Sequence, residues 1–159
     1  LIPARYLYTH RMNPTDTSEG GYVGSEMYAI GLDQAKSRIH AAFSGHVLTH
    51  RRSLCNAAAN GQASGVAWFD SDVELMNEVM VYGSIVNGKG TLGYNIGTEK
   101  SQLPLFALRP DLLNIRQAWW LRDVCSAVHF AFVGGDGVAY VGGASFSWFG
   151  VRPVFSISA

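Results

Sequence analysis

Residues 118–158, AWWLRDVCSAVHFAFVGGDGVAYVGGASFSWFGVRPVFSIS, alternate between apolar segments and a glycine-rich stretch. AWWL, VHFAFV and VRPVFSIS have the length and apolar pattern of short strands. Because proline cannot donate to a sheet ladder, Pro153 is expected at the start or edge of its strand. Residues 134–150 instead hold six glycines, four aromatic residues and one charged residue. Side chains of such unequal size suit neither a close-packed core nor a simple solvated loop.

The segment before these strands carries a helical pattern. Apolar residues recur at steps of three and four, which predicts an amphipathic helix of about 17 residues that ends near Gly45. Its inner face comprises Tyr28, Leu32, Ala35, Ile39 and Phe43.

Two further helices are predicted. Thr49 is a candidate cap for a short one, which ends before the turn at Asn60. Ser71 and Glu74 have the spacing of a capping box for the next, with Gly83 as its C-cap. The inner sides would comprise Leu54, Cys55 and Ala58 in the first helix and Leu75, Met76, Val79 and Met80 in the second.

Helices followed by short strands predict an α+β fold in one domain spanning residues 1–159. LPLFAL at residues 103–108 is read as a further strand. Trp119 and Trp120 should point to opposite sides of theirs, one into the core and the other against a neighbouring element. Three more side chains have expected structural roles: Arg122 and Asp123 as a buried ion pair, and Arg152 as a donor to loop carbonyls.

Composition restricts the function. Twelve basic and twelve acidic residues leave no net charge, which argues against nucleic acid or an anionic membrane as partner. No apolar run reaches the length of a membrane span, so membrane insertion is not expected. The chain begins without Met, and we expect it to be the C-terminal part of a longer one.

Few residues suggest catalysis or metal binding. His46 and His50 are four apart but have no acidic neighbour in the sequence, and Cys55 is expected to be a buried apolar residue. GGDGVAYVG resembles a calcium-binding repeat, but Ala139 replaces its aspartate. The sequence therefore predicts no catalytic residue, no metal and no cofactor.

An ordered series of motifs, "WWLRDV.SA", "FA.V", "GAS.S" and "GVRP.F.I", resembles the variable region of diversity-generating retroelement target proteins. Upstream stretches such as "GGYVGSEMY", "AWFDSDVELMNE" and "KSQLPLFALRPDL" are similar to the scaffold of one such group from phages and prophages, so the resemblance covers almost the whole chain. It implies a C-type-lectin-like fold, related to that of formylglycine-generating enzymes, with two or three helices packed on short antiparallel strands and long irregular loops. "ASFSWFGVRP" is one residue longer than the pattern expected of the family.

The family diversifies part of the target gene by adenine-specific errors of a reverse transcriptase. The resemblance implies a scaffold at residues 1–123, a variable display region at 124–149 and a closing strand at 150–159. The ligand-binding positions would be Val128, His129, Phe132, Gly134, Gly135, Asp136, Val138, Tyr140, Gly142, Gly143, Phe146 and Trp148. All but Trp148 are encoded by codons reachable from Asn by changing only adenines; Cys125 and Val141 are further candidates. The frame that stays constant would comprise Phe130, Ala131, Val133, Gly137, Ala139, Ala144, Ser145, Ser147 and residues 150–153.

The implied function is receptor recognition at the tip of a phage tail fibre, or display on the bacterial surface. The partner would be a host-cell surface protein or glycan, and the chain would form a homotrimer or another homo-oligomer in the fibre. Two alternatives remain open. One is an enzyme of the formylglycine-generating type, which would need paired reactive cysteines or a metal. The other is a structural virion protein whose loop packs against a neighbouring subunit.

Overall fold

The computed structural model describes residues 1–91 and 93–158. Its helices are α1 (Asp33–Phe43), α2 (Glu78–Tyr82) and α3 (Pro104–Leu108), with a π-helical turn at Met27–Gly31 and a 3-10 turn at Pro110–Leu113. Its strands are β1 (Tyr8–Thr9), β2 (His50–Ala59), β3 (Gln62–Ser71), β4 (Val73–Leu75), β5 (Trp119–Val124), β6 (His129–Val133), β7 (Ala139–Gly143), β8 (Gly150–Val151) and β9 (Pro153–Phe155). No helix in these residues is long and apolar enough to cross a membrane.

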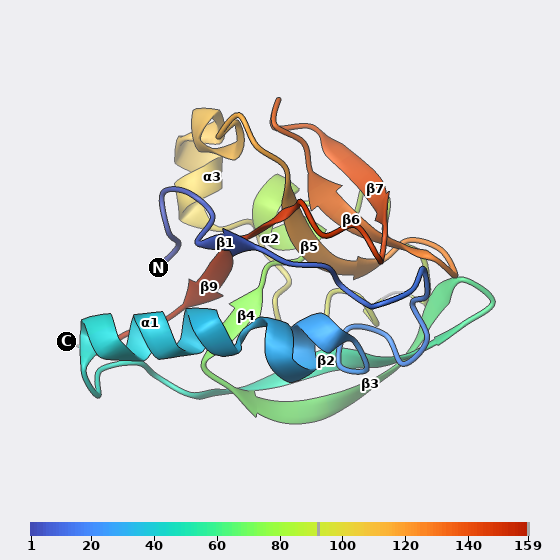
Figure 1. The fold of residues 1–159 in the computed structure, drawn as a ribbon, viewed down its shortest axis with the longest axis horizontal. Helices are drawn as coiled ribbons and strands as arrows, with labels where there is room; N and C mark the ends of the chain where they lie inside the picture. Colours follow the sequence, from blue (N-terminus) through green and yellow to red (C-terminus); the bar gives the residue numbers. More distant parts are fainter. Residues whose placement is uncertain (92, 159) are drawn as a thin grey trace.

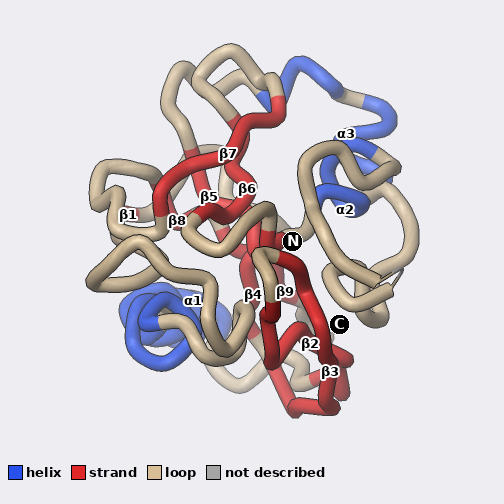
Figure 2. Tube along the Cα trace, turned by 90° about the vertical axis from the view of Figure 1, so that its right-hand side faces the viewer, coloured by secondary structure: helices blue, strands red, loops and turns tan. Residues whose placement is uncertain are grey.

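The strands form one five-stranded sheet and two separate pairs (Figure 1). The sheet has the order β1-β8-β5-β6-β7, with β6 antiparallel to both of its neighbours, β5 and β7, and β8 parallel to β5. β2 pairs with β3 and β4 with β9. Figure 2 shows α1 on one side of the strands and α2 and α3 on the other. The predicted α+β class is confirmed.

The first helical prediction is confirmed in outline. α1 ends at Phe43, and Gly45 follows with a φ of 82°. Leu32, Ala35 and Ile39 are buried as expected. Instead of one continuous helix, the chain makes the π-helical turn before α1.

The second predicted helix is wrong. Residues 50–59 are strand β2, which forms a long hairpin with β3. Asn60 and Gly61 have φ angles of 53° and 73° and join the two strands, so the predicted turn is confirmed. Two positive φ values are the geometry of the type I′ turn that Asn-Gly favours in a two-residue hairpin.

Two other predicted elements differ in the structure. The third helix begins at Glu78, because residues 73–75 form β4 and Asn77 caps the helix by accepting from the Met80 backbone N–H at 2.7 Å. The Ser71 hydroxyl does bond the Glu74 carboxylate, but outside any helix. LPLFAL is not a strand: residues 104–108 form α3, whose first helical residue is Pro104.

The two tryptophans of β5 separate two hydrophobic clusters. Trp120 packs with Phe130 and Phe149, whereas Trp119 packs with Phe106 on the opposite side. Both are fully buried, and the Trp120 indole N–H donates to the His10 carbonyl at 2.7 Å. The predicted alternation is therefore confirmed.

Arg152 also behaves as expected. Its guanidinium donates to the carbonyls of Pro3 and Leu112 at 3.0 and 2.9 Å and lies over the Trp119 ring. These bonds join the chain's first residues to its last strands. Pro153 is the first residue of β9, as its missing N–H requires.

The predicted Arg122–Asp123 ion pair is wrong. Successive residues of a strand face opposite sides, so the two side chains of β5 find different partners. Arg122 donates to the Glu99 carboxylate at 2.7 Å, while Asp123 accepts the Glu78 backbone N–H at 2.8 Å. The other oxygen of Asp123 is buried without a hydrogen-bond partner.

Asp123 should make stability fall with rising pH. Burial, and then the nearby Glu78 carboxylate, raise the pKa of Asp123 to about 8 from its ordinary 3.8. The folded protein therefore holds a proton that the unfolded chain releases above pH 4. This stabilisation is complete below pH 4 and is lost as pH rises to about 8.

Replacing this acid with a neutral isostere should remove the effect. Between pH 5 and pH 8, the unfolding free energy of the wild type should fall by at least about 1 kcal/mol more than that of Asp123→Asn. Urea unfolding at both pH values measures it, with the exposed Asp70→Asn as control. Parallel pH profiles for the wild type and Asp123→Asn would show that Asp123 does not carry this proton.

Candidate ligand-binding surface

The β6–β7 hairpin and the loop that follows it hold nearly all of the predicted binding residues. The pairing register places Phe132 opposite Tyr140 and His129 opposite Gly143. Several residues of the predicted constant frame are buried: Phe130, Ala131, Val133, Ala144, Val151, Arg152 and Pro153.

The twelve predicted positions differ in exposure. Trp148 is 59% exposed, Val138 51%, Tyr140 43% and Val128 37%, and Asp136 is also exposed. His129, Phe132, Gly135 and Phe146 are half-buried, whereas Gly134, Gly142 and Gly143 are buried. The two further candidates diverge as well, because Val141 is exposed and Cys125 is buried.

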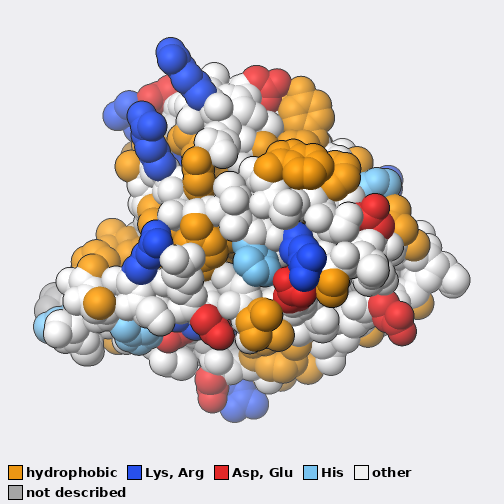
Figure 3. Space-filling view, viewed as in Figure 1, with side chains coloured by type: hydrophobic (Ala, Val, Ile, Leu, Met, Phe, Trp, Pro, Cys, Tyr) orange, Lys and Arg blue, Asp and Glu red, His pale blue; other side chains and the backbone are white. Residues whose placement is uncertain are grey.

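Four of these residues form two stacked ring pairs, which we together call the aromatic surface: Phe132, Tyr140, Phe146 and Trp148. Phe132 stacks on Tyr140 with ring centroids 5.6 Å apart, and Phe146 stacks on Trp148 at 4.6 Å. Figure 3 shows hydrophobic side chains gathered over this part of the molecule. Phe132 comes from β6, Tyr140 from β7, and the other two rings from the loop before β8. All four therefore lie within one short segment of the chain, residues 132–148.

Phe149 joins the two stacked pairs from below and was missed as a site residue. Its ring lies 4.2 Å from that of Phe132 and 5.8 Å from that of Phe146. It is 7% exposed and packs edge-on against Trp120 at 4.7 Å. The one-residue excess in "ASFSWFGVRP" was the only sequence signal near this position.

Two glycines make room for the rings. A Cβ on Gly142 would lie 2.7 Å from the Phe149 ring and 3.1 Å from that of Phe132. A Cβ on Gly134 would lie 2.6 Å from the Tyr140 ring. Glycine at positions 134 and 142 leaves the space that the neighbouring rings occupy. A larger residue at either position would require those rings to move.

Two ionised carboxylates border the aromatic surface. Asp136 accepts the Tyr140 hydroxyl at 2.9 Å and the Val138 backbone N–H at 3.0 Å; these bonds lower its pKa, the backbone bond most. Asp16 accepts the Ser145 backbone N–H at 2.9 Å, which likewise lowers its pKa. Asp16 is 129 residues distant in sequence from Ser145, so the sequence reading did not include it.

The two cysteines are free, and His46, one of the two histidines singled out in the sequence, lies at the surface. Cys55 and Cys125 are both free and buried, and burial raises the pKa of each thiol. His46 is exposed and lies 3.3 Å from the Ser158 hydroxyl. Across residues 1–91 and 93–158, no group of three His, Cys, Asp or Glu could hold a metal ion.

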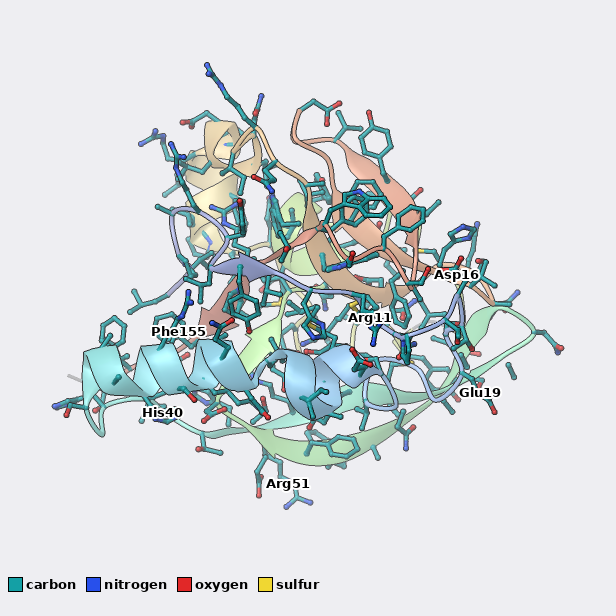
Figure 4. All side chains as sticks on the ribbon, viewed as in Figure 1. Arg11, Asp16, Glu19, His40, Arg51 and Phe155 are labelled. Atoms are coloured by element: carbon teal, nitrogen blue, oxygen red, sulfur yellow. The ribbon has the colours of Figure 1, made fainter. Side chains whose placement is uncertain are left out.

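A cavity of about 390 Å³ lies away from the aromatic surface, between α1 and the first residues of the chain. Its lining is apolar and includes Ile39, Phe43 and Phe155, apart from Arg38, which donates to the Leu7 carbonyl at 3.0 Å. Figure 4 labels Phe155 on this side, distant from Asp16. The cavity contains none of the predicted binding residues.

Comparisons with known proteins assign the chain to no family. No protein-family model, no curated protein and no solved structure matches it.

Proposed function

We propose that this chain is a diversified ligand-binding domain with a C-type-lectin-like fold, which recognises a host-cell surface protein or glycan through the aromatic surface. Its setting would be the tip of a phage tail fibre or a bacterial surface. The observation that carries the proposal is the separation between frame and display. Phe130, Ala131, Val133 and Ala144 are fully buried, whereas Tyr140 and Trp148 are among the most exposed rings of the chain.

This separation fits the demands of diversification. A folded domain is stable by only about 5–15 kcal/mol, and a typical substitution costs about 1 kcal/mol. Positions that change many times must therefore contribute little to folding. Val128, Val138 and Tyr140, which are exposed over a buried frame, meet this condition. Rigid aromatic residues among Gly and Ser are typical of binding loops.

The enzyme alternative receives less support from the cysteines. A catalytic cysteine reacts as the thiolate in an accessible, electropositive environment. Cys55 and Cys125 are buried, and their raised pKa values keep both thiols protonated. We therefore do not propose a catalytic function.

Removing exposed rings should separate binding from stability. We expect Tyr140→Ala and Trp148→Ala to change the unfolding free energy by less than about 1 kcal/mol, because both side chains are largely solvated. Leu75→Ala, which empties a fully buried position, should cost at least about 2 kcal/mol. Urea unfolding of the three variants measures these differences, and a loss above about 2 kcal/mol for Tyr140→Ala would contradict the display role.

The gene itself offers the sharper test of diversification. We expect a near-copy of the region encoding residues 124–149 close to the gene, differing from it only at adenines. Sequencing the locus in related strains checks this. Sibling copies that never differ at codons 132, 140 and 146 would remove the diversification part of the proposal. A subunit-packing role would instead appear as burial of residues 128–146 in the assembled particle.

A further inference from the structure

The aromatic surface carries a charge pattern that narrows its ligand. We propose that it takes an arginine-bearing segment of a partner protein, with the guanidinium groups held between the rings and the carboxylates of Asp16 and Asp136. The inference rests on the proposed function, since it uses the same surface, and it adds the chemical class of the partner.

The two carboxylates lie toward different ends of the surface. Asp136 is bonded to the Tyr140 hydroxyl at one end of β7. Asp16 lies against the other end, where its Oδ1 is 2.8 Å from the position of a Cβ on Gly143. The same Cβ position on Gly143 lies 3.1 Å from the Phe146 ring, so Asp16 borders the Phe146 side of the surface. The backbone positions of residues 140 and 143 are roughly 10 Å apart along the strand. Two cationic side chains of one extended segment can span this separation.

Neither carboxylate forms an ion pair with a Lys or Arg of the described chain. Arg11, which Figure 4 shows in the region between α1 and Asp16, instead donates to Glu26 from two of its three guanidinium nitrogens, Nε and Nη2, at 2.9 and 3.1 Å. The hydrogen bonds from Ser145 lower the pKa of Asp16 most, and the contribution of His129 is the smallest. The chain as a whole is neutral, but these two negative charges have no Lys or Arg partner in the described residues and are left to a partner protein.

Both carboxylates are also oriented before any ligand arrives. Backbone N–H groups of Ser145 and Val138 hold one oxygen of each. Fixed groups lose less conformational freedom on binding than free side chains do. Orientation by backbone donors therefore makes these two acids better anchors than an average surface aspartate.

The rings add the second half of the recognition. An aromatic face carries negative electrostatic potential and attracts a cation placed over it, and arginine is the commonest such partner. The planar guanidinium also stacks on rings and pairs with carboxylates through two parallel bonds. Trp148 and Tyr140, the most exposed rings of the surface, provide such faces. A neutral glycan would use the rings but would gain less from two ionised acids.

The test measures binding of the immobilised chain to poly-L-arginine, poly-L-glutamate and dextran at low and at physiological salt. The variants are Asp16→Asn, Asp136→Asn and the double variant, because asparagine removes the charge and keeps an oxygen for the backbone donor. At position 136 the amide nitrogen would replace the oxygen that accepts the Tyr140 hydroxyl, so this variant also changes that bond. Asp70→Asn, an exposed acid on β3, is the matched control. Trp148→Ala reports on the rings.

We expect poly-L-arginine to bind best, with about threefold weakening for each Asn variant and about tenfold for the double variant. Asp70→Asn should change the affinity by less than about twofold. Preference for dextran or poly-L-glutamate, or affinity unaffected by the double variant, would overturn the arginine inference. If Trp148→Ala still weakens the binding of dextran or poly-L-glutamate, the aromatic surface remains the proposed binding site. If Trp148→Ala has no effect on any probe, the proposed surface itself is wrong.

Discussion

Arg122→Ala should destabilise the protein by about 3–5 kcal/mol. The guanidinium is 3% exposed, bonds the Glu99 carboxylate at 2.7 Å and also donates to the Leu75 carbonyl. Arg52 reaches the same carboxylate from β2. Removing Arg122 leaves Glu99 partly buried with half of its charge compensation gone. That loss, rather than the intrinsic strength of the pair, makes the change costly.

The control is an ion pair of similar geometry on the surface. Arg109 bonds both oxygens of Asp111 at 2.8 and 2.7 Å, but both side chains are exposed. Arg109→Ala should therefore cost less than about 1 kcal/mol. Urea unfolding at pH 7 compares the two variants. Equal losses would mean that burial does not determine the contribution of Arg122.

The Arg122–Glu99 ion pair also shows what the sequence could and could not predict. Arg122 was expected to be buried and paired, because it follows the apolar residues WWL at the end of a predicted strand. Its partner was assigned to the adjacent Asp123, although Glu99 is 23 residues away and lies in a loop. Strand alternation excludes adjacent partners, but only the three-dimensional fold brings Glu99 to Arg122.

Elements with a strong local pattern were predicted well. The helical periodicity identified α1, the short apolar run AWWL identified β5, and the alternation in VHFAFV identified β6. β2 was missed because its apolar residues, among them Leu54 and Ala58, fit a helix as well as a strand. A bulge between Cys55 and Ala57 interrupts the period-two pattern of β2. The strand that pairs with β2 is β3, which begins directly after the turn. The Asn60-Gly61 turn indicated a hairpin more strongly than the apolar pattern of residues 50–59 indicated a helix.

The candidate surface shows the same limit. Its rings were recognised from composition, as side chains that neither core nor solvated loop would accommodate. Asp16 could not be found, because its contact with Ser145 joins the chain's first residues to its last. The roles of Gly142 and Phe149 depend on ring positions that no local pattern encodes.

Phe149→Ala is the change that should affect stability and binding together. The ring is buried among Trp120, Phe132 and Phe146, so its removal leaves a cavity beneath the aromatic surface. Loss of a buried phenylalanine typically costs about 3–5 kcal/mol. The stacked pairs above would also lose their common support, and we expect binding through Tyr140 and Trp148 to weaken.

Phe146→Ala provides the comparison within the same cluster. Phe146 is half-buried and stacks outward on Trp148, so its removal opens the surface rather than the core. We expect it to cost less than about 2 kcal/mol while binding is lost. Urea unfolding and binding measured on both variants distinguish support from display. If Phe146→Ala proved as destabilising as Phe149→Ala, the outer rings would be part of the folding core, and a surface free to vary could not include them.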